Sequence, residues 1–173
     1  MVGARSPQFM LLFISMIYAS LIWALVGCTG NQMAGLSAEI LRTPEGLAEW
    51  QRGEDRFKKE MQLALEQYQQ EAVPKVLKGY ETAVRGYLDH GFGLYRAYRK
   101  SKLDLPADLI PSLEQRTSLL MDVADEYIKH GSLAMGESIA ADVVHNYSDL
   151  PTLTPAQRRA EAVLLRYRYR QDY

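Results

Sequence analysis

The fold is decided by residues 44–72, PEGLAEWQRGEDRFKKEMQLALEQYQQEA, which predict one long amphipathic helix. Apolar residues recur there every three to four positions, the spacing of one helical face; they are Leu47, Trp50, Phe57, Met61, Ala64 and Tyr68. Most residues between them are charged or Gln, and Glu54 is the one polar break in the stripe. Thr43 suits the N-cap position and Pro44 the first helical position. Pro74 then ends or kinks the helix.

The same periodicity continues beyond Pro74. A second apolar stripe runs from Val76 to Leu88, and the helix that carries it is expected to stop at His90-Gly91. A shorter helix is expected next, with Leu94, Tyr95 and Tyr98 on one side, before a connection bracketed by Pro106 and Pro111. Glycine accepts the left-handed conformation that ends helices, which is the reason for placing a stop at Gly91.

Three more helices are predicted in the remaining chain. Ser112 and Gln115 have capping-box spacing at the start of one, and His130-Gly131 ends it. The next helix ends before Pro151, and Thr154 with Gln157 forms a second capping box that opens the last one. No segment alternates long enough with β-branched residues to predict a strand. The sequence therefore predicts an all-α domain of antiparallel helical hairpins over residues 44–173.

One pentapeptide pattern occurs twice, forty residues apart: Tyr87-Leu88-Asp89-His90-Gly91 and Tyr127-Ile128-Lys129-His130-Gly131. The second copy resembles a degenerate tetratricopeptide repeat, because large and small residues fall on that repeat's packing positions: Leu120, Val123, Ala124, Tyr127, Gly131, Gly136, Ala140 and Val143. The first copy departs from the pattern after Gly91. Two interpretations stay open, a repeat pair or two unrelated helices that end alike. In either case His90 and His130 are expected to be helix-terminal residues near the negative end of the dipole.

The N-terminal segment has the pattern of a targeting signal. Arg5 precedes an uncharged run over residues 9–26, which ends in Leu25-Val26-Gly27-Cys28. A positive start, an apolar run and a small residue before the sole cysteine resemble the lipobox signal peptide of bacterial lipoproteins. The resemblance implies a signal peptide over residues 1–27, a lipidated Cys28 and a short tether to residue 43. An uncleaved transmembrane anchor is the alternative, because the run is long enough to span a bilayer.

Lipidation would determine where the protein resides. In the family that it resembles, the Cys28 thiol takes diacylglycerol, a peptidase cuts before Cys28, and the new amine is usually acylated. Arg5 stays inside the cell, so the mature chain is expected to face the periplasm. Thr29 follows the cysteine, and the absence of Asp at that place favours the outer membrane over the inner membrane, which remains the alternative.

Composition and motifs give no pattern for catalysis. Without residues 1–27 the chain has 19 Lys and Arg against 21 Asp and Glu, so we expect no nucleic-acid partner. Three histidines without a second cysteine give no zinc pattern, and neither a phosphate loop nor a nucleophile elbow is present. We therefore expect no enzyme, no metal and no cofactor beyond the lipid on Cys28.

Two clusters of Arg and Tyr, residue types enriched at binding hot spots, are the candidate partner-binding sites. The residues are Tyr95, Arg96, Tyr98 and Arg99 in the first cluster and Arg166, Arg168, Tyr169 and Arg170 in the second. The leading hypothesis is a lipid-anchored helical adaptor or assembly factor that docks another cell-envelope protein. The alternatives are a ligand-binding or inhibitory envelope lipoprotein and a structural subunit of an envelope complex. Self-association stays open.

Overall fold

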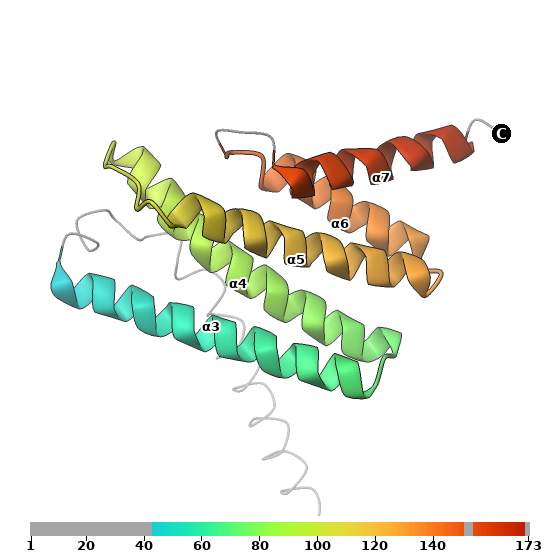
Figure 1. Cartoon of the computed structure of the whole chain (residues 1–173), viewed down its shortest axis with the longest axis horizontal. Coiled ribbons are helices and arrows are strands. Elements are labelled where there is room, and N and C mark those ends of the chain that lie inside the picture. The colour runs from blue at the N-terminus through green and yellow to red at the C-terminus, as the bar shows by residue number, and fades with distance from the viewer. Residues whose placement is uncertain (1–42, 151–153, 172–173) are drawn as a thin grey trace, which may run out of the picture. The chain divides into compact units, whose positions relative to one another are not determined.

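The computed structural model describes residues 43–150 and 154–171, without the side chains of residues 167–171. The expected signal peptide, Cys28 and its tether therefore lie outside the described residues. Five helices follow one another along the chain (Figure 1): α3 (Pro44–Gln70), α4 (Pro74–Lys100), α5 (Leu109–Lys129), α6 (Leu133–Asn146) and α7 (Pro155–Gln171). The described residues contain no strand, so the all-α prediction is confirmed.

Each helix packs against the next one in the sequence, and α7 packs against α5 as well as α6. At the level of the backbone, α3 has α4 as its single neighbour among the described helices. None of the described helices combines the length and the apolar character that crossing a membrane requires. The helices form a stack of antiparallel hairpins in which α3 and α7 lie at opposite ends (Figure 1).

Helix α3 begins as its sequence predicts. The Thr43 hydroxyl accepts a hydrogen bond from the Gly46 amide at 3.1 Å, and Pro44 occupies the first helical position. Met61 and Tyr68 are buried against α4, whereas Leu47 is 43% exposed near the N-terminal end. Trp50, Phe57 and Ala64 of the predicted stripe are half-buried, so the stripe faces α4 along the helix except at Leu47.

Helix α4 differs from the prediction, because it runs without interruption through His90 and Gly91 to Lys100. The expected stop and the separate short helix after it are wrong. A Cβ atom on Gly91 would lie 2.7 Å from Arg116 Nη1 and 2.8 Å from Leu113 Cδ2. Glycine is present there because α5 passes close to α4, and not because the helix ends. His90 is consequently a buried residue in the middle of a helix.

The expected capping box at Ser112 and Gln115 is also wrong. Helix α5 begins earlier, at Leu109, so that Pro111 falls in its first turn, where proline costs no helical hydrogen bond. The Ser112 hydroxyl instead accepts hydrogen bonds from Arg116, at 3.2 Å from Nε and 3.1 Å from Nη2.

The other predicted helix ends agree with the structure. The Ser132 amide donates to the Tyr127 carbonyl at 2.8 Å, and Gly131 has a φ of +77°, as in a Schellman ending of α5. The Thr154 amide donates to Gln157 Oε1 at 2.7 Å, and the Gln157 amide donates to Thr154 Oγ1 at 3.2 Å. Gly91 and Gly131 thus have different roles, so the repeated pentapeptide is not one shared helix ending.

The turn from α5 to α6 brings these two helices unusually close together. A Cβ on Gly136 would lie 2.6 Å from Ile128 Cγ1 and 3.0 Å from the Ala124 carbonyl oxygen. Small residues at this crossing match the packing positions on which the repeat resemblance rests. The antiparallel hairpins are shown, and membership of the tetratricopeptide class stays a prediction.

Candidate partner-binding surface

The first predicted cluster lies near the C-terminal end of α4, and half of it is used inside the protein. Tyr95 is 1% exposed, and its hydroxyl donates to the Asp149 carbonyl at 2.7 Å. This burial corrects the expectation that Tyr95 offers its side chain to a partner. Its ring belongs to the core, where it makes an edge contact with Phe92 at 6.1 Å between ring centroids.

Arg96 also bonds within the protein, although its side chain is 52% exposed. Its Nη2 donates to the Asn146 carbonyl at 2.7 Å, and its Nε donates to the Asp149 carboxylate at 3.2 Å. Tyr98 is half-buried, whereas Arg99 is exposed, with its guanidinium 5.9 Å from the centre of the Tyr95 ring. Tyr95 and Arg96 therefore fasten α4 to the segment before α7, and Arg99 is the freest member of this cluster.

The second predicted cluster lies on α7, which extends through Gln171. Arg166 is exposed and forms no ion pair among the described side chains, while the side chains of Arg168, Tyr169 and Arg170 lie outside the described part. Leu165 beside it is 53% exposed. This cluster stays a candidate contact surface.

A buried ion pair that the sequence did not reveal joins α3 to α5. Arg116 is 3% exposed, and its guanidinium donates to both carboxylate oxygens of Glu54, one of them at 3.1 Å. It also donates to the Tyr87 carbonyl at 2.8 Å and lies 3.9 Å from the centre of the Tyr87 ring. The only hint in the sequence was Glu54 itself, the polar break in the apolar stripe of α3.

A second buried carboxylate, Glu81, lies between α4 and α5. It accepts hydrogen bonds from Lys78 at 2.8 Å, from Arg85 at 2.9 Å and from the Tyr127 hydroxyl at 3.0 Å. Burial raises the pKa of Glu81, but these donors outweigh it, and the net pKa lies below its ordinary value. Arg85 also reaches Asp142 on α6 at 2.8 Å, so one network crosses three helices.

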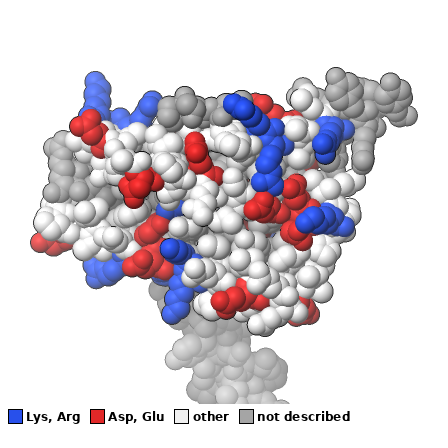
Figure 2. All heavy atoms as spheres, in the orientation of Figure 1, with Lys and Arg blue, Asp and Glu red and all other residues white. Residues whose placement is uncertain are grey.

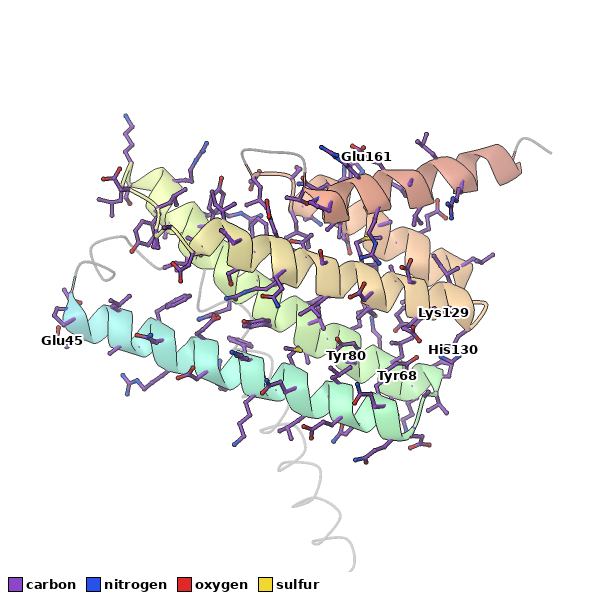
Figure 3. The ribbon with its side chains drawn as sticks, in the orientation of Figure 1. Glu45, Tyr68, Tyr80, Lys129, His130 and Glu161 are labelled. Carbon is purple, nitrogen blue, oxygen red and sulfur yellow. The ribbon has the colours of Figure 1, made fainter. Side chains whose placement is uncertain are left out.

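A third polar cluster closes the opposite end of α3 (Figure 3). The Tyr68 hydroxyl donates to Glu126 at 2.8 Å and lies 3.0 Å from His130 Nε2. Burial first, and Glu126 next, raise the pKa of Tyr68 to about 12. The phenol is therefore protonated at neutral pH and acts as a hydrogen-bond donor, which argues against a nucleophilic role.

His90 lies beneath α3 and serves packing. Its ring stacks on Trp50 at 5.2 Å between centroids and 9° between planes, and its Nε2 lies 3.2 Å from the Trp50 carbonyl oxygen. Burial lowers the pKa of His90, more than the nearby Glu54 raises it. The expectation of a helix-terminal histidine is wrong at His90 and confirmed at His130, which follows the last residue of α5.

These polar clusters hold neighbouring helices together. Their charged groups are satisfied largely by protein partners on neighbouring helices. Within residues 43–150 and 154–171, no group of three or more His, Cys, Asp or Glu side chains could hold a metal ion.

The outward side of α3 has no neighbour among the described helices. Leu63 is 48% exposed there, on the side of the helix opposite to buried Met61 and Tyr68. By helical spacing its neighbours on this face are Lys59, Glu60, Glu66 and Gln67, all of them exposed. We refer to Leu63 and these four residues as the α3 outer face.

Comparison with known proteins adds no relative from which a function could be transferred. Neither the models of known protein families, nor the curated proteins, nor the solved structures contain a match to this chain.

Proposed function

We propose that this protein is a lipid-anchored, periplasm-facing helical adaptor or assembly factor that docks another cell-envelope protein. The proposed lipid anchor and periplasmic location rest on the lipobox resemblance at Leu25-Val26-Gly27-Cys28. The proposed role is non-catalytic, because the buried polar groups between the helices hold the helices to one another.

The observation that carries the docking role is the α3 outer face. An end helix of a hairpin stack has one side without a neighbouring helix, and here Leu63 exposes about half of its side chain on that side. An apolar centre with a polar rim is the usual composition of a protein–protein interface. The surrounding charges include both signs, which favours a protein partner over a uniformly charged polymer.

The test uses a photo-crosslinking amino acid at position 63 in the cells that make the protein. We expect a stoichiometric crosslink to one envelope protein. The same reagent at exposed Ser138 on α6 is the matched control and should give no such product.

Mass spectrometry of the purified product reads both the crosslinked peptide and the N-terminal peptide. An acylated Cys28 together with a single partner supports an anchored adaptor, and Cys28→Ala should release the complex from the membrane. A lipidated protein that crosslinks to nothing at position 63 contradicts the docking role while preserving the anchor.

A further inference from the structure

Charge is distributed unevenly between α7 and the rest of the described chain. Helix α7 contains five arginines and one acidic residue, Glu161. Residues 43–150 contain 13 Lys and Arg against 18 Asp and Glu. Arg159 pairs with two carboxylates, Asp122 at 2.9 Å and Asp125 at 2.7 Å, so these three residues together carry one net negative charge. The other arginines of α7 account for a cationic excess at this end of the stack.

Cations at the end of α4 extend this excess. Five exposed cations that form no ion pair among the described side chains lie in this region: Arg99, Lys100 and Lys102 near the end of α4, and Arg158 and Arg166 on α7. Figure 2 shows Lys and Arg side chains projecting over both elements, along the upper edge of the view. We call these five residues the cationic side.

The two parts of the cationic side are joined by internal contacts. Arg96 and Tyr95 of α4 bond to Asn146 and Asp149, in the segment that leads into α7. These bonds hold α4 to the end of α6 and to the segment after it, although α4 and α7 make no backbone contact with each other. The five cations therefore form two patches on one packed stack of helices.

We propose that the cationic side lies against an anionic lipid surface, with α7 facing the head groups. The inference rests on the proposed lipid anchor, and it adds an orientation to it. The 15 residues between Cys28 and the start of the helical domain reach at most about 50 Å when fully extended. The anchor thus keeps the domain close to the membrane at high effective concentration, and the cationic side selects which face approaches.

The pattern fits lipid better than an acidic protein helix. A docked helix needs several apolar anchors at intervals of three and four residues, and the described side chains of α7 expose one large apolar residue, Leu165. An anionic bilayer, in contrast, does not require the residues that contact it to follow a fixed helical spacing. Each Lys or Arg close to its surface strengthens binding by about fivefold, and salt weakens the effect.

The carboxylates in the same region reduce the attraction without cancelling it. Glu161 on α7, and Asp104 and Asp108 after α4, are exposed, so three carboxylates oppose the five cations. The α3 outer face has mixed charge and lies on the opposite end of the stack (Figure 1). With α7 on the membrane, the α3 outer face is left available to a protein partner.

The test measures how deeply a nitroxide label lies when the lipidated protein is reconstituted into vesicles. Leu165→Cys carries the label, and Leu63→Cys on α3 is the matched control with a similar exposed fraction. Acylated Cys28 does not react, so each variant has one free thiol. The vesicles consist of phosphatidylcholine, with or without phosphatidylglycerol.

We expect accessibility of the label at position 165 to a water-soluble nickel relaxant to fall severalfold when phosphatidylglycerol is present. Accessibility at position 63 should not change. High salt, or the double substitution Arg158→Glu with Arg166→Glu, should restore the accessibility at position 165. Equal accessibility at both positions in phosphatidylglycerol vesicles overturns the proposal. So does shielding at position 165 that is independent of lipid charge, because that result indicates a protein contact or a second copy of this chain.

Flotation tests the anchor separately. A protein that floats with phosphatidylcholine vesicles but shows no shielding at position 165 retains the anchor and refutes the orientation. A protein that does not float refutes the anchor. In that case, binding of the protein from solution to phosphatidylglycerol vesicles tests whether the cationic side contacts anionic lipid. If the protein binds and the arginine substitutions abolish binding, lipid contact by the cationic side is supported. If the protein does not bind, lipid contact by the cationic side is overturned.

Discussion

Replacing Glu54 by leucine should destabilise the protein more than an ordinary substitution on a helix surface. The change leaves the Arg116 guanidinium 3% exposed without its carboxylate. Breaking one partner of a buried ion pair costs about 3–5 kcal/mol. The Glu54 side chain is itself 17% exposed, and the Tyr87 carbonyl and Ser112 hydroxyl still accept from Arg116. We therefore expect the lower end, a loss of about 3 kcal/mol in the free energy of unfolding.

Removing the other partner of the pair, Arg116, should lower the free energy of unfolding by less. Arg116→Met leaves a carboxylate that can turn toward water, so we expect a loss of about 2 kcal/mol. Combining it with Glu54→Leu removes both charges, and the double variant should lie within about 1 kcal/mol of the wild type. The two substitutions are then strongly non-additive, as expected for a direct pair.

Urea unfolding of the four proteins measures this cycle. With a slope of about 2 kcal/mol per molar urea, Glu54→Leu should lower the midpoint by about 1.5 M. Arg56→Met is the control, because the Arg56–Glu60 pair is exposed and 3.9 Å long; its loss should cost less than about 0.5 kcal/mol. Additive losses in the double variant would refute the assignment of Glu54 and Arg116 as a coupled buried pair.

Three further predictions concern packing, caps and pH. Burial lowers the pKa of His90, so stability should fall as pH drops through about 6.5, the unfolded-state value; His90→Phe should flatten this fall in unfolding measured from pH 7.5 to 5. Gly136→Ala should cost about 1–3 kcal/mol by overpacking, whereas Gly79→Ala, with open space around it, should gain about 0.5–1 kcal/mol; equal effects in thermal melts would contradict the close α5–α6 crossing. Thr154→Ala should cost about 1 kcal/mol through loss of the cap, and an unchanged unfolding midpoint would argue against it.

Helix type and most helix ends could be predicted because they depend on local chemistry. Thr43-Pro44, Gly131 and the Thr154–Gln157 pair each satisfy backbone groups within a few residues, so the sequence alone reveals them. Gly91 could not be interpreted in this way. Its role depends on Arg116 and Leu113 of α5, which approach only in the folded protein.

The candidate surfaces were predicted less completely for the same reason. Tyr95 and Arg96 have the residue types of a binding site, but their partners, Asn146 and Asp149, lie some fifty residues away. Arg99 and Arg166 are exposed, as a surface role requires. The exposed position of Leu63 follows from α3 having one neighbour among the helices that the structure describes, which periodicity alone does not reveal.

The packing of each helix on the next also affects how the protein folds. A chain whose contacts are mostly local closes short loops at low entropic cost, and such chains fold quickly. The α3–α4 hairpin contains the Trp50–His90 stack and can form while later residues are still emerging from a ribosome. The bond from Glu54 to Arg116 has to wait for α5. Until α5 arrives, the Glu54 carboxylate stays in water, so the desolvation of the ion pair is deferred to a late step of folding.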